Sequence, residues 1–544
     1  MSTAANKFTE IPVLIAGGGP VGMTLALFLA HYGVASILVE QNASTTRHPK
    51  MDLTNGRSME LFRRIGLADT LRRVGVPAAN PFDIAYLTSL AGHEIHHFVI
   101  PSASQTAQEI AERNDGTHAR EEPLRVSQVV IEPVLKDAVD AHPLIDVRFG
   151  TCFEEITENG AEEVLATVRH RDSGMVETIR CQYLIGCDGG GSRVRRQLGI
   201  PLDGEQGVAG AYMVHFRSGD ADLLQRFGVL WHTQTPLGTM IAQDDQEVFT
   251  LQRWLLPDDE PDKLNPETLL EQWAGRSFDY EILQANPWTA HFVVAQSYRK
   301  GRVILAGDAA HQYVPTGGYG MNSGIADAAA LSWVLAALVQ GWGGETLLTA
   351  YEEERRPTAW MHLEASQRHL GTRIDIHTRY ANYDKLDDDT PEGEAQRREL
   401  GAYIENIGNA ENASWGVEWG YRYDHSPIIS YDGEAPEFEP VDYRPNTCPG
   451  ARLPHIFLEP GVSIHDRLGS YFTAISLDGS DLGAFAQAAQ AQNIPLETLI
   501  LDRPDLLSVY EKPILLVRPD QHIAWRGEAL PEEVAPILAK AVGR

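Results

Sequence analysis

The chain has few of the features that mark disulfide-bonded or metal-binding proteins. Its 544 residues include four cysteines, and no two of them stand in a CxxC pair. So few thiols argue against a disulfide framework, and we expect a reducing, cytoplasmic location. HEIHH at 93–97 is not HExxH, which needs a helix to place two imidazoles on one face, so we expect no metal site. The cysteines are Cys152, Cys181, Cys187 and Cys448.

Basic residues and long apolar runs are scarce as well. Lys and Arg number 45 against 75 Asp and Glu, which gives a formal net charge of -30. Such a field repels a phosphate backbone, so we expect no nucleic-acid partner. The N-terminal MSTAANKFTEIP lacks the basic flank and apolar core of a signal peptide, and no apolar run reaches the ~18–20 residues that span a bilayer. We therefore expect no membrane association, and stretch 328–339 predicts a buried helix.

Glycines, by contrast, are present in an informative pattern near the N-terminus. GGGPVG at 17–22 matches GxGxxG through Gly17, Gly19 and Gly22. Gly17 permits a tight turn, Gly19 lets the backbone approach a pyrophosphate, and Gly22 lets a helix pack closely on a strand. The motif predicts a dinucleotide site whose anion rests on a helix N-terminus.

The surrounding pattern supports this interpretation. An apolar run at 11–16 predicts a buried strand, 23–32 a helix, and 36–39 a second strand that ends at Glu40. A carboxylate at Glu40 can accept hydrogen bonds from ribose hydroxyls. This βαβ unit suits FAD and NAD equally well.

Two later segments repeat the arrangement of strand, acid, glycines and helix. YLIGCDGGGSRVRR at 183–196 places Asp188 after an apolar strand, and Asp308 follows the strand at 302–305. A helix is expected from 323 to 340. The glycine loop before it can turn backbone N–H groups toward an anionic ring, and the helix dipole adds to their effect. The alternative is that each aspartate merely caps a turn.

In order and spacing, these three motifs resemble those of the class A flavoprotein monooxygenases, which include para-hydroxybenzoate hydroxylase and phenol hydroxylase. The resemblance covers residues 11 to about 370. It implies FAD as cofactor and NADH or NADPH as co-substrate. It also implies that a small phenolic substrate and O2 are the partners, and that the ring is hydroxylated through a flavin hydroperoxide.

The same resemblance implies an α/β fold, with a glutathione-reductase-like Rossmann FAD domain, an inserted β-sheet substrate domain and a C-terminal thioredoxin-like domain. The last of these lacks the CxxC on which redox work depends, so we expect a packing role or a homodimer contact. The expected divisions are 1–85, 105–200 and 295–370 for the FAD domain, 86–104 and 201–294 for the substrate domain, 371–435 for a helical extension and linker, and 436–544 for the C-terminal domain.

Local patterns add expectations within these domains. Residues 56–74 predict one helix, 103–122 a polar surface excursion and 128–142 an amphipathic helix. VRPDQHIAWR at 517–526 predicts a β-hairpin with its turn at 519–521.

The resemblance also places cofactor contacts on individual residues. Asp308 is expected to hold the ribityl and pyrophosphate part of FAD, and Asp188 to serve both the flavin and the approach of the nicotinamide. The remaining expected contacts are Arg47, Arg57, Gln128, Gly318, Gly320, Met321 and Asn322, beside Gly17, Gly19, Gly22 and Glu40.

Asp52 is the best candidate for a catalytic base, and Pro315, which opens the glycine loop, joins it in the predicted catalytic set. A phenol is a poor carbon nucleophile until it loses its proton, so a base near the hydroxyl should help. Phenol hydroxylases carry an aspartate at the spacing that Asp52 has from RSME at 57–60. Asp52 could equally cap the helix before Ser58.

Other polar and aromatic residues favour structural roles. For His311 we expect a structural hydrogen bond. The aromatic residues of the substrate domain, such as Trp231, His232, Trp254 and Trp288, are more often sheet core than pocket. A flavin halogenase should show a WxWxIP stretch, which is absent. The motifs are also compatible with an oxidase, a reductase or a non-catalytic FAD-binding protein.

Overall fold

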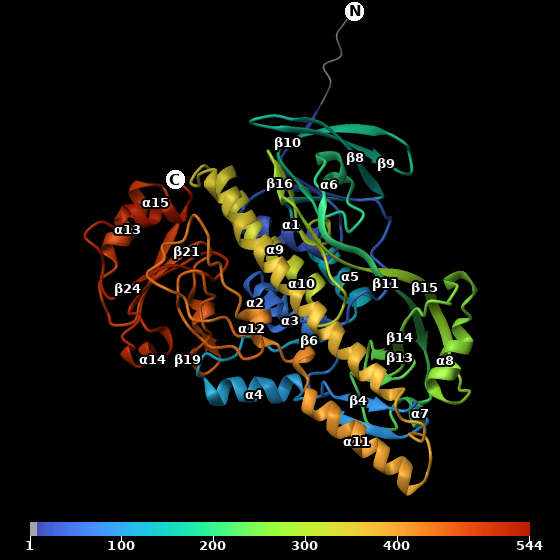
Figure 1. Cartoon of the computed structure of the whole chain (residues 1–544). Helices are drawn as coiled ribbons and strands as arrows, with labels where there is room; N and C mark the ends of the chain where they lie inside the picture. Colours follow the sequence, from blue (N-terminus) through green and yellow to red (C-terminus); the bar gives the residue numbers. More distant parts are fainter. Residues whose placement is uncertain (1–7) are drawn as a thin grey trace, which may run out of the picture.

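The computed structural model describes residues 8–544, so most of the segment behind the signal-peptide argument lies outside the described residues. Within this range, three large sheets form three lobes (Figure 1). The first lies at the top of the view, the second below and to the right, and the C-terminal sheet to the left. This arrangement confirms the α/β fold predicted from the sequence.

The first sheet is the Rossmann-type core. Its main path runs β16-β17-β10-β1-β2-β7, and β1 pairs in parallel with both β10 and β2. Residues Val13 to Ala16 are fully buried because helices α1 and α5 pack on the sheet and α9 packs on α1. The elements are β1 (Thr9–Ala16), α1 (Pro20–His31), β2 (Ser36–Glu40), α5 (Gln128–Asp140), β7 (Ile145–Phe149), β8 (Thr151–Asn159), β9 (Val164–His170), β10 (Val176–Gly186), α6 (Arg193–Leu198), β16 (Arg299–Lys300), β17 (Val303–Leu305) and α9 (Tyr319–Val339).

The second sheet has the order β18-β15-β11-β14-β13-β12-β4-β5. Its longest pair, β11 with β15, is antiparallel and bends at register shifts after Glu205 and His215. A separate apolar core lies on one face, under α8. The elements are β4 (Ile84–Leu87), β5 (Glu94–Phe98), β11 (Leu202–Arg217), α7 (Ala221–Leu224), β12 (His232–Thr235), β13 (Gly238–Ala242), β14 (Val248–Trp254), α8 (Pro266–Ala274), β15 (Glu281–Ala295) and β18 (His311–Gln312).

The C-terminal sheet has the order β22-β21-β23-β24, with β21 parallel to β22 and antiparallel to β23. The predicted hairpin is confirmed, and Gln521 at its turn has φ 68°. Arg518, just before this turn, pairs with Glu354 of the neighbouring lobe, and both side chains are buried. The elements are β21 (Phe472–Ser476), α13 (Gly483–Ala491), β22 (Leu496–Ile500), α14 (Leu507–Tyr510), β23 (Ile514–Val517), β24 (Ile523–Gly527) and α15 (Ala535–Ala541).

A long helix links the lobes. α10 (Thr346–Tyr380) runs down the molecule in Figure 1 and leads to α11 (Pro391–Ile407), which packs on β5. The chain then returns through η3 (Ala410–Asn412) and α12 (Trp415–Trp419). Because of this return, the segment between the FAD domain and the C-terminal domain passes close to both large sheets.

Two predicted helices and the predicted surface excursion differ from the structure. The helix expected at 56–74 is two helices, α2 (Gly56–Arg64) and α3 (Ala68–Val74), because Gly66 between them has φ +76°. The excursion at 103–122 contains α4 (Ala103–Arg113), and Ser102 and Gln105 form a capping box at its N-terminus. The helix expected from 323 is α9, which already begins at Tyr319.

α9 is the one helix in the described range that is long and apolar enough to span a membrane by those criteria alone. However, 89% of its apolar window is buried inside the protein. It packs against α1 and α10, as a core helix does.

Candidate active site

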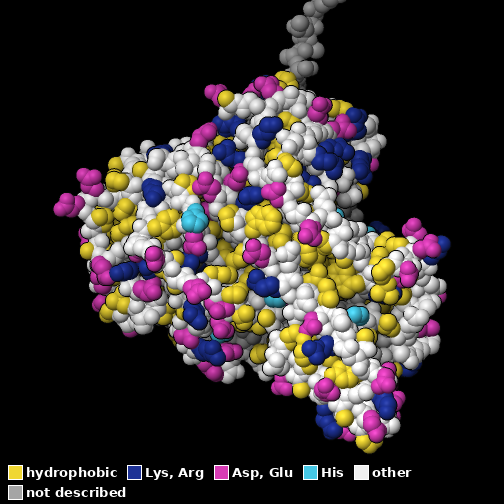
Figure 2. Space-filling model, in the orientation of Figure 1, with side chains coloured by type: hydrophobic (Ala, Val, Ile, Leu, Met, Phe, Trp, Pro, Cys, Tyr) yellow, Lys and Arg dark blue, Asp and Glu magenta, His cyan; other side chains and the backbone are white. Residues whose placement is uncertain are grey.

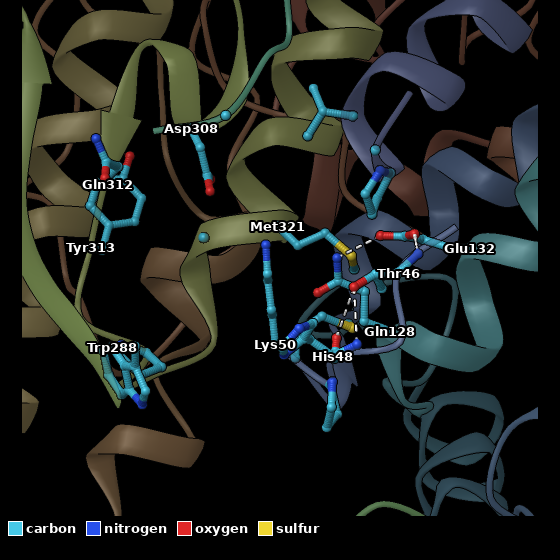
Figure 3. A pocket seen from close by; sticks show the side chains of 18 of the residues that line it. Thr46, His48, Lys50, Gln128, Glu132, Trp288, Asp308, Gln312, Tyr313 and Met321 are labelled. Carbon is cyan, nitrogen blue, oxygen red and sulfur yellow. Dashed lines mark hydrogen bonds between the residues drawn. The ribbon is translucent and has the colours of Figure 1, made fainter. Parts of the chain in front are cut away.

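A cavity of about 1130 Å³ lies between the first and second sheets. One wall carries the glycine turn after β1 and the loop before α9, and the other is the open face of the second sheet. Residues from α10, η3 and α12 close it further. Figure 2 shows hydrophobic side chains gathered in the middle of one face of the molecule, and Figure 3 shows the cavity from close by.

The three predicted glycines of the turn have distinct surroundings. Gly17 has φ +114°, and a Cβ there would lie 2.2 Å from the Cys187 carbonyl oxygen. A Cβ on Gly22 would lie 1.9 Å from the Gly17 oxygen, so Gly22 serves helix packing and is not part of the cavity wall. A Cβ on Gly19 would meet no protein atom within 4 Å. Gly19 therefore leaves space at the cavity, as approach to a pyrophosphate requires.

Glu40 and the loop after it form the next part of the wall. Gly18 N donates to Glu40 Oε2 at 2.9 Å, which holds the carboxylate at the end of β2. Gln128 Nε2 and Thr46 N both donate to Glu132, each at 2.7 Å (Figure 3). Arg47 also lines the cavity. Lys50, which the sequence motifs do not indicate, projects into it (Figure 3).

The two motif aspartates differ. Asp188 accepts hydrogen bonds from the first turn of α6, because Arg193 N and Val194 N donate to its carboxylate at 2.6 and 3.1 Å, while Ser192 is the N-cap of the helix. The Asp188 side chain therefore has the turn-capping role that the sequence left open, and Asp188 also lines the cavity. Asp308 accepts no hydrogen bond from the described residues and points into the cavity (Figure 3). Its enclosure by the protein raises the pKa of its carboxyl above the usual value.

Hydrogen bonds on the side away from the cavity hold the glycine loop before α9. Gly317 and Gly318 have φ +82° and +67°, and Gly318 N donates to the Pro315 oxygen at 3.0 Å. Asn322 is not in the cavity wall; its Nδ2 donates to the oxygens of Gly318 and Leu53 at 2.7 and 3.1 Å. The loop is thereby tied to the segment that carries Asp52. The wall residues predicted here are Pro315, Gly318, Gly320 and Met321.

Arg57 was predicted to contact the cofactor, but its side chain does not line the cavity. Its Nη2 donates to the Asp520 carbonyl oxygen at 2.7 Å, and its Nη1 contacts Glu60 and Gln521. The side chain points away from the cavity toward the C-terminal hairpin, so it joins two domains. Its position in α2 could be predicted from the sequence, but the direction of its side chain could not.

Asp52 lies in the cavity wall, and it does not cap α2. That cap is Asn55, whose side chain accepts from Ser58 N at 2.9 Å. The indole N–H of Trp231 donates to Asp52 Oδ2, and His232 Nε2 lies 3.6 Å from the same oxygen. Burial alone would raise the pKa of Asp52, but His232, Trp231 and Arg125 outweigh it and lower the pKa. Asp52 is thus a carboxylate at neutral pH.

The second sheet supplies wall residues for which the sequence favoured a core role. Trp231, His232, Trp254 and Trp288 all line the cavity. Residues two apart on a strand share a face, but the sequence does not show which face lies toward the cofactor. Among the other histidines, His311 does have a structural role, since its Nε2 contacts Asp327 Oδ2 at 2.8 Å.

Four more wall residues come from the helical extension, for which the sequence predicts no site residue. Arg373 lies on α10, Glu411 and Asn412 in η3, and Glu418 in α12. Burial raises the pKa of Glu418 to about 8, so this carboxyl is mostly protonated at neutral pH. No local motif surrounds these residues, and only the return of the chain brings them to the cavity. No group of His, Cys, Asp and Glu in the described range could hold a metal ion.

These features fit FAD. The open space at Gly19, the carboxylate at the end of β2 and the cations Arg47 and Lys50 match an adenosine diphosphate. The unpaired Asp308 can accept hydrogen bonds from sugar-like hydroxyls, and the glycine loop offers backbone N–H groups.

Comparison with known families agrees. Residues 10–366 match the family described as FAD binding domain, and residues 446–544 match the one described as aromatic-ring hydroxylase, C-terminal. The chain belongs to the FAD-dependent aromatic-ring hydroxylases. These are the class A flavoprotein monooxygenases that the three motifs resemble.

Individual relatives of this family match over nearly the whole chain. The FAD-dependent monooxygenase apdD of Emericella nidulans is 38% identical over 98% of this chain and 90% of its own. The 2,4-dichlorophenol 6-monooxygenase of Delftia acidovorans is 30% identical over 98% of each. The solved structure of the rebeccamycin biosynthetic enzyme RebC with reduced flavin has a TM-score of 0.90 at 33% identity, covering 99% of this chain and 100% of that one. These relatives support a monooxygenase over an oxidase, a reductase or a halogenase.

Proposed function

We propose that this FAD-dependent aromatic monooxygenase uses NADH or NADPH and O2 to hydroxylate a phenolic ring. The observation that carries the proposal is the position of Asp52. It lies in the cavity wall, its segment is tied to the glycine loop through Asn322, and its side chain contacts Trp231 and His232. When bound, FAD supplies the activation of oxygen, and the protein supplies position and charge.

The chain's own residues bind and orient the ring. Trp231 fixes the Asp52 carboxylate by its N–H, which leaves the second oxygen as a hydrogen-bond acceptor for a ring hydroxyl. A hydroxyl that donates to a carboxylate makes the ring richer in electrons and more reactive at carbon. Ile241 and Met213 of the second sheet, together with Trp231, Trp254 and Trp288, exclude water from the ring.

We propose that the nicotinamide co-substrate binds beside α6. Arg193 and Arg196 of α6 line it beside Gly189 and Gly191. Two guanidinium groups next to a glycine turn suit the phosphates of NADH or NADPH. The cytoplasmic location and the homodimer expected from the sequence stay predictions.

A panel of phenols tests the proposal. The FAD-loaded protein should oxidise NADH or NADPH faster when a suitable phenol is added, and mass spectra should show a product with one added oxygen. If no phenol in a broad panel accelerates the oxidation, the proposal fails. If the oxidation accelerates without any hydroxylated product, the protein is an oxidase toward its co-substrate.

A further inference from the structure

Two charged residues in the cavity wall are not accounted for by the predicted cofactor contacts. Arg373 and Glu411 both come from the helical extension, and they lie in the same cavity as Asp52 and His232. Arg373 Nε donates to Glu411 Oε2 at 2.6 Å. Gly317 N of the glycine loop makes a long contact with Glu411 Oε1 at 3.4 Å. Glu411 therefore fixes the direction of the guanidinium beside the loop.

The guanidinium keeps unused donors. Its Nη1 makes one long contact, 3.4 Å to Thr239 Oγ1, and no described residue accepts from Nη2. A guanidinium carries five N–H donors, so three of them have no acceptor in the protein. The Arg373 side chain is 21% exposed, and it faces the cavity. A ligand oxygen in the cavity can accept hydrogen bonds from these donors in place of water.

Arg373 stays positively charged at neutral pH. Burial would lower the pKa of the guanidinium, but Glu411, Tyr86 and Asp52 raise it. Burial would also raise the pKa of Glu411, and Arg373 lowers it again. The wall thus presents an acceptor, Asp52, and a cationic donor, Arg373, to the same space. Arg373 contacts Thr239 of β13, which pairs with Gln234 of β12, whereas Asp52 contacts Trp231, three residues before Gln234. At about 3.4 Å per residue, the two contact points are therefore about 10 Å apart along the sheet.

We propose that Arg373, held by Glu411, binds an oxygen acceptor of the substrate, away from the hydroxyl that Asp52 receives. The preferred substrates are then aromatic rings that carry a hydroxyl and, on a carbon not adjacent to it, a carbonyl or carboxylate. This inference rests on the proposed function, since it assumes that a ring hydroxyl meets Asp52. A hydrogen bond from a charged guanidinium to such an oxygen is worth roughly a 10- to 100-fold difference in affinity.

Three naphthols test the pairing in the FAD-loaded protein. 1-Naphthol has the hydroxyl alone, 4-acetyl-1-naphthol adds a carbonyl, and 4-hydroxy-1-naphthoic acid adds a carboxylate. Dissociation constants come from the change in flavin absorbance on titration. We expect the native protein to bind at least one of the two substituted probes about 10- to 100-fold more tightly than 1-naphthol. The stronger of the two identifies the oxygen.

Variants then assign the preference to Arg373. Arg373→Met should bind all three probes with similar affinity, and Arg373→Lys should keep part of the preference because the charge remains without the planar fork. Glu411→Gln should weaken it, since the guanidinium loses its anchor. Arg368→Met is the matched control, because Arg368 lies on the same helix, is exposed and is not in the cavity wall. It should leave the preference unchanged.

Several results would overturn the proposal. They are equal binding of the three probes by the native protein, no binding of any probe, or a preference that survives in Arg373→Met. Loss of FAD from Arg373→Met would also overturn it, because the guanidinium would then serve a flavin carbonyl. Hydroxylation of 1-naphthol together with equal binding would leave the proposed function intact, so the two failures can be told apart.

Discussion

The cofactor side of the cavity is built largely from backbone in three contiguous motifs, whereas the substrate side is built from side chains of separate segments. On the first side, the turns at 17–21, 188–191 and 315–321 present backbone N–H groups. On the second, Asp52, His232 and Arg373 come from a loop, a strand and a helix. A cofactor shared by many enzymes can be recognised by local motifs, whereas a substrate is recognised by groups that only the fold brings together.

The largest effect is expected in the glycine turn. Gly22→Ala places a Cβ against the Gly17 oxygen, which forces α1 away from β1 and prevents a stable FAD-loaded fold. Gly19→Ala, the matched control, meets no protein atom. It should keep the melting temperature of the cofactor-free protein and lose FAD affinity. Melting curves measure the stability of each variant, and titration measures its FAD affinity. Normal FAD binding by Gly19→Ala would contradict the assignment of the space at Gly19 to the pyrophosphate.

On the substrate side, Asp52→Ala should retain FAD and slow ring hydroxylation by roughly 100-fold or more. The loss should be greatest for phenols of high pKa, because phenols that are already ionised at the assay pH need no acceptor for their proton. Product formation against phenol pKa is the measurement. Turnover like that of the native protein would remove Asp52 from the mechanism.

Asp308 is a side chain, rather than a backbone group, on the cofactor side of the cavity. Asp308→Asn removes the unpaired carboxylate in the cavity. We expect FAD affinity to fall by roughly 10- to 100-fold, as for the loss of hydrogen bonds to a charged group. The cofactor-free protein should be no less stable, because burial disfavours the charged form of Asp308. Unchanged FAD affinity would mean that the free carboxylate has another role.

Glu418 on the substrate side gives the smallest effect, and it depends on pH. Its pKa of about 8 lies above the usual value, so it stabilises the fold below pH 4.5 and this contribution is lost as pH rises through about 8. Glu418→Gln should therefore match the native protein near pH 5 and melt about 1–3 °C higher at pH 9. Glu405→Gln, at an exposed position, is the control and should follow the native curve. A lower melting temperature for Glu418→Gln at pH 9 would contradict this.

The same contrast between the two sides explains what the sequence could predict. The βαβ unit, the two further glycine motifs and the C-terminal hairpin rest on short-range patterns, and the structure contains them all. Arg57 was misassigned because α2 turns its side chain toward the C-terminal domain, where its partner Asp520 is 463 residues away in the sequence. Arg373 and Glu411 could not be predicted, because their place depends on the path of a helix and the return of the chain.

Transfer of oxygen itself is the most direct test of the account. The FAD-loaded protein would be supplied with NADH or NADPH, an accepted phenol and ¹⁸O-labelled dioxygen, and the product analysed by mass spectrometry. One labelled oxygen on the ring is expected for each reduced nicotinamide consumed. A product without the label, or nicotinamide oxidation that yields only hydrogen peroxide, would contradict it.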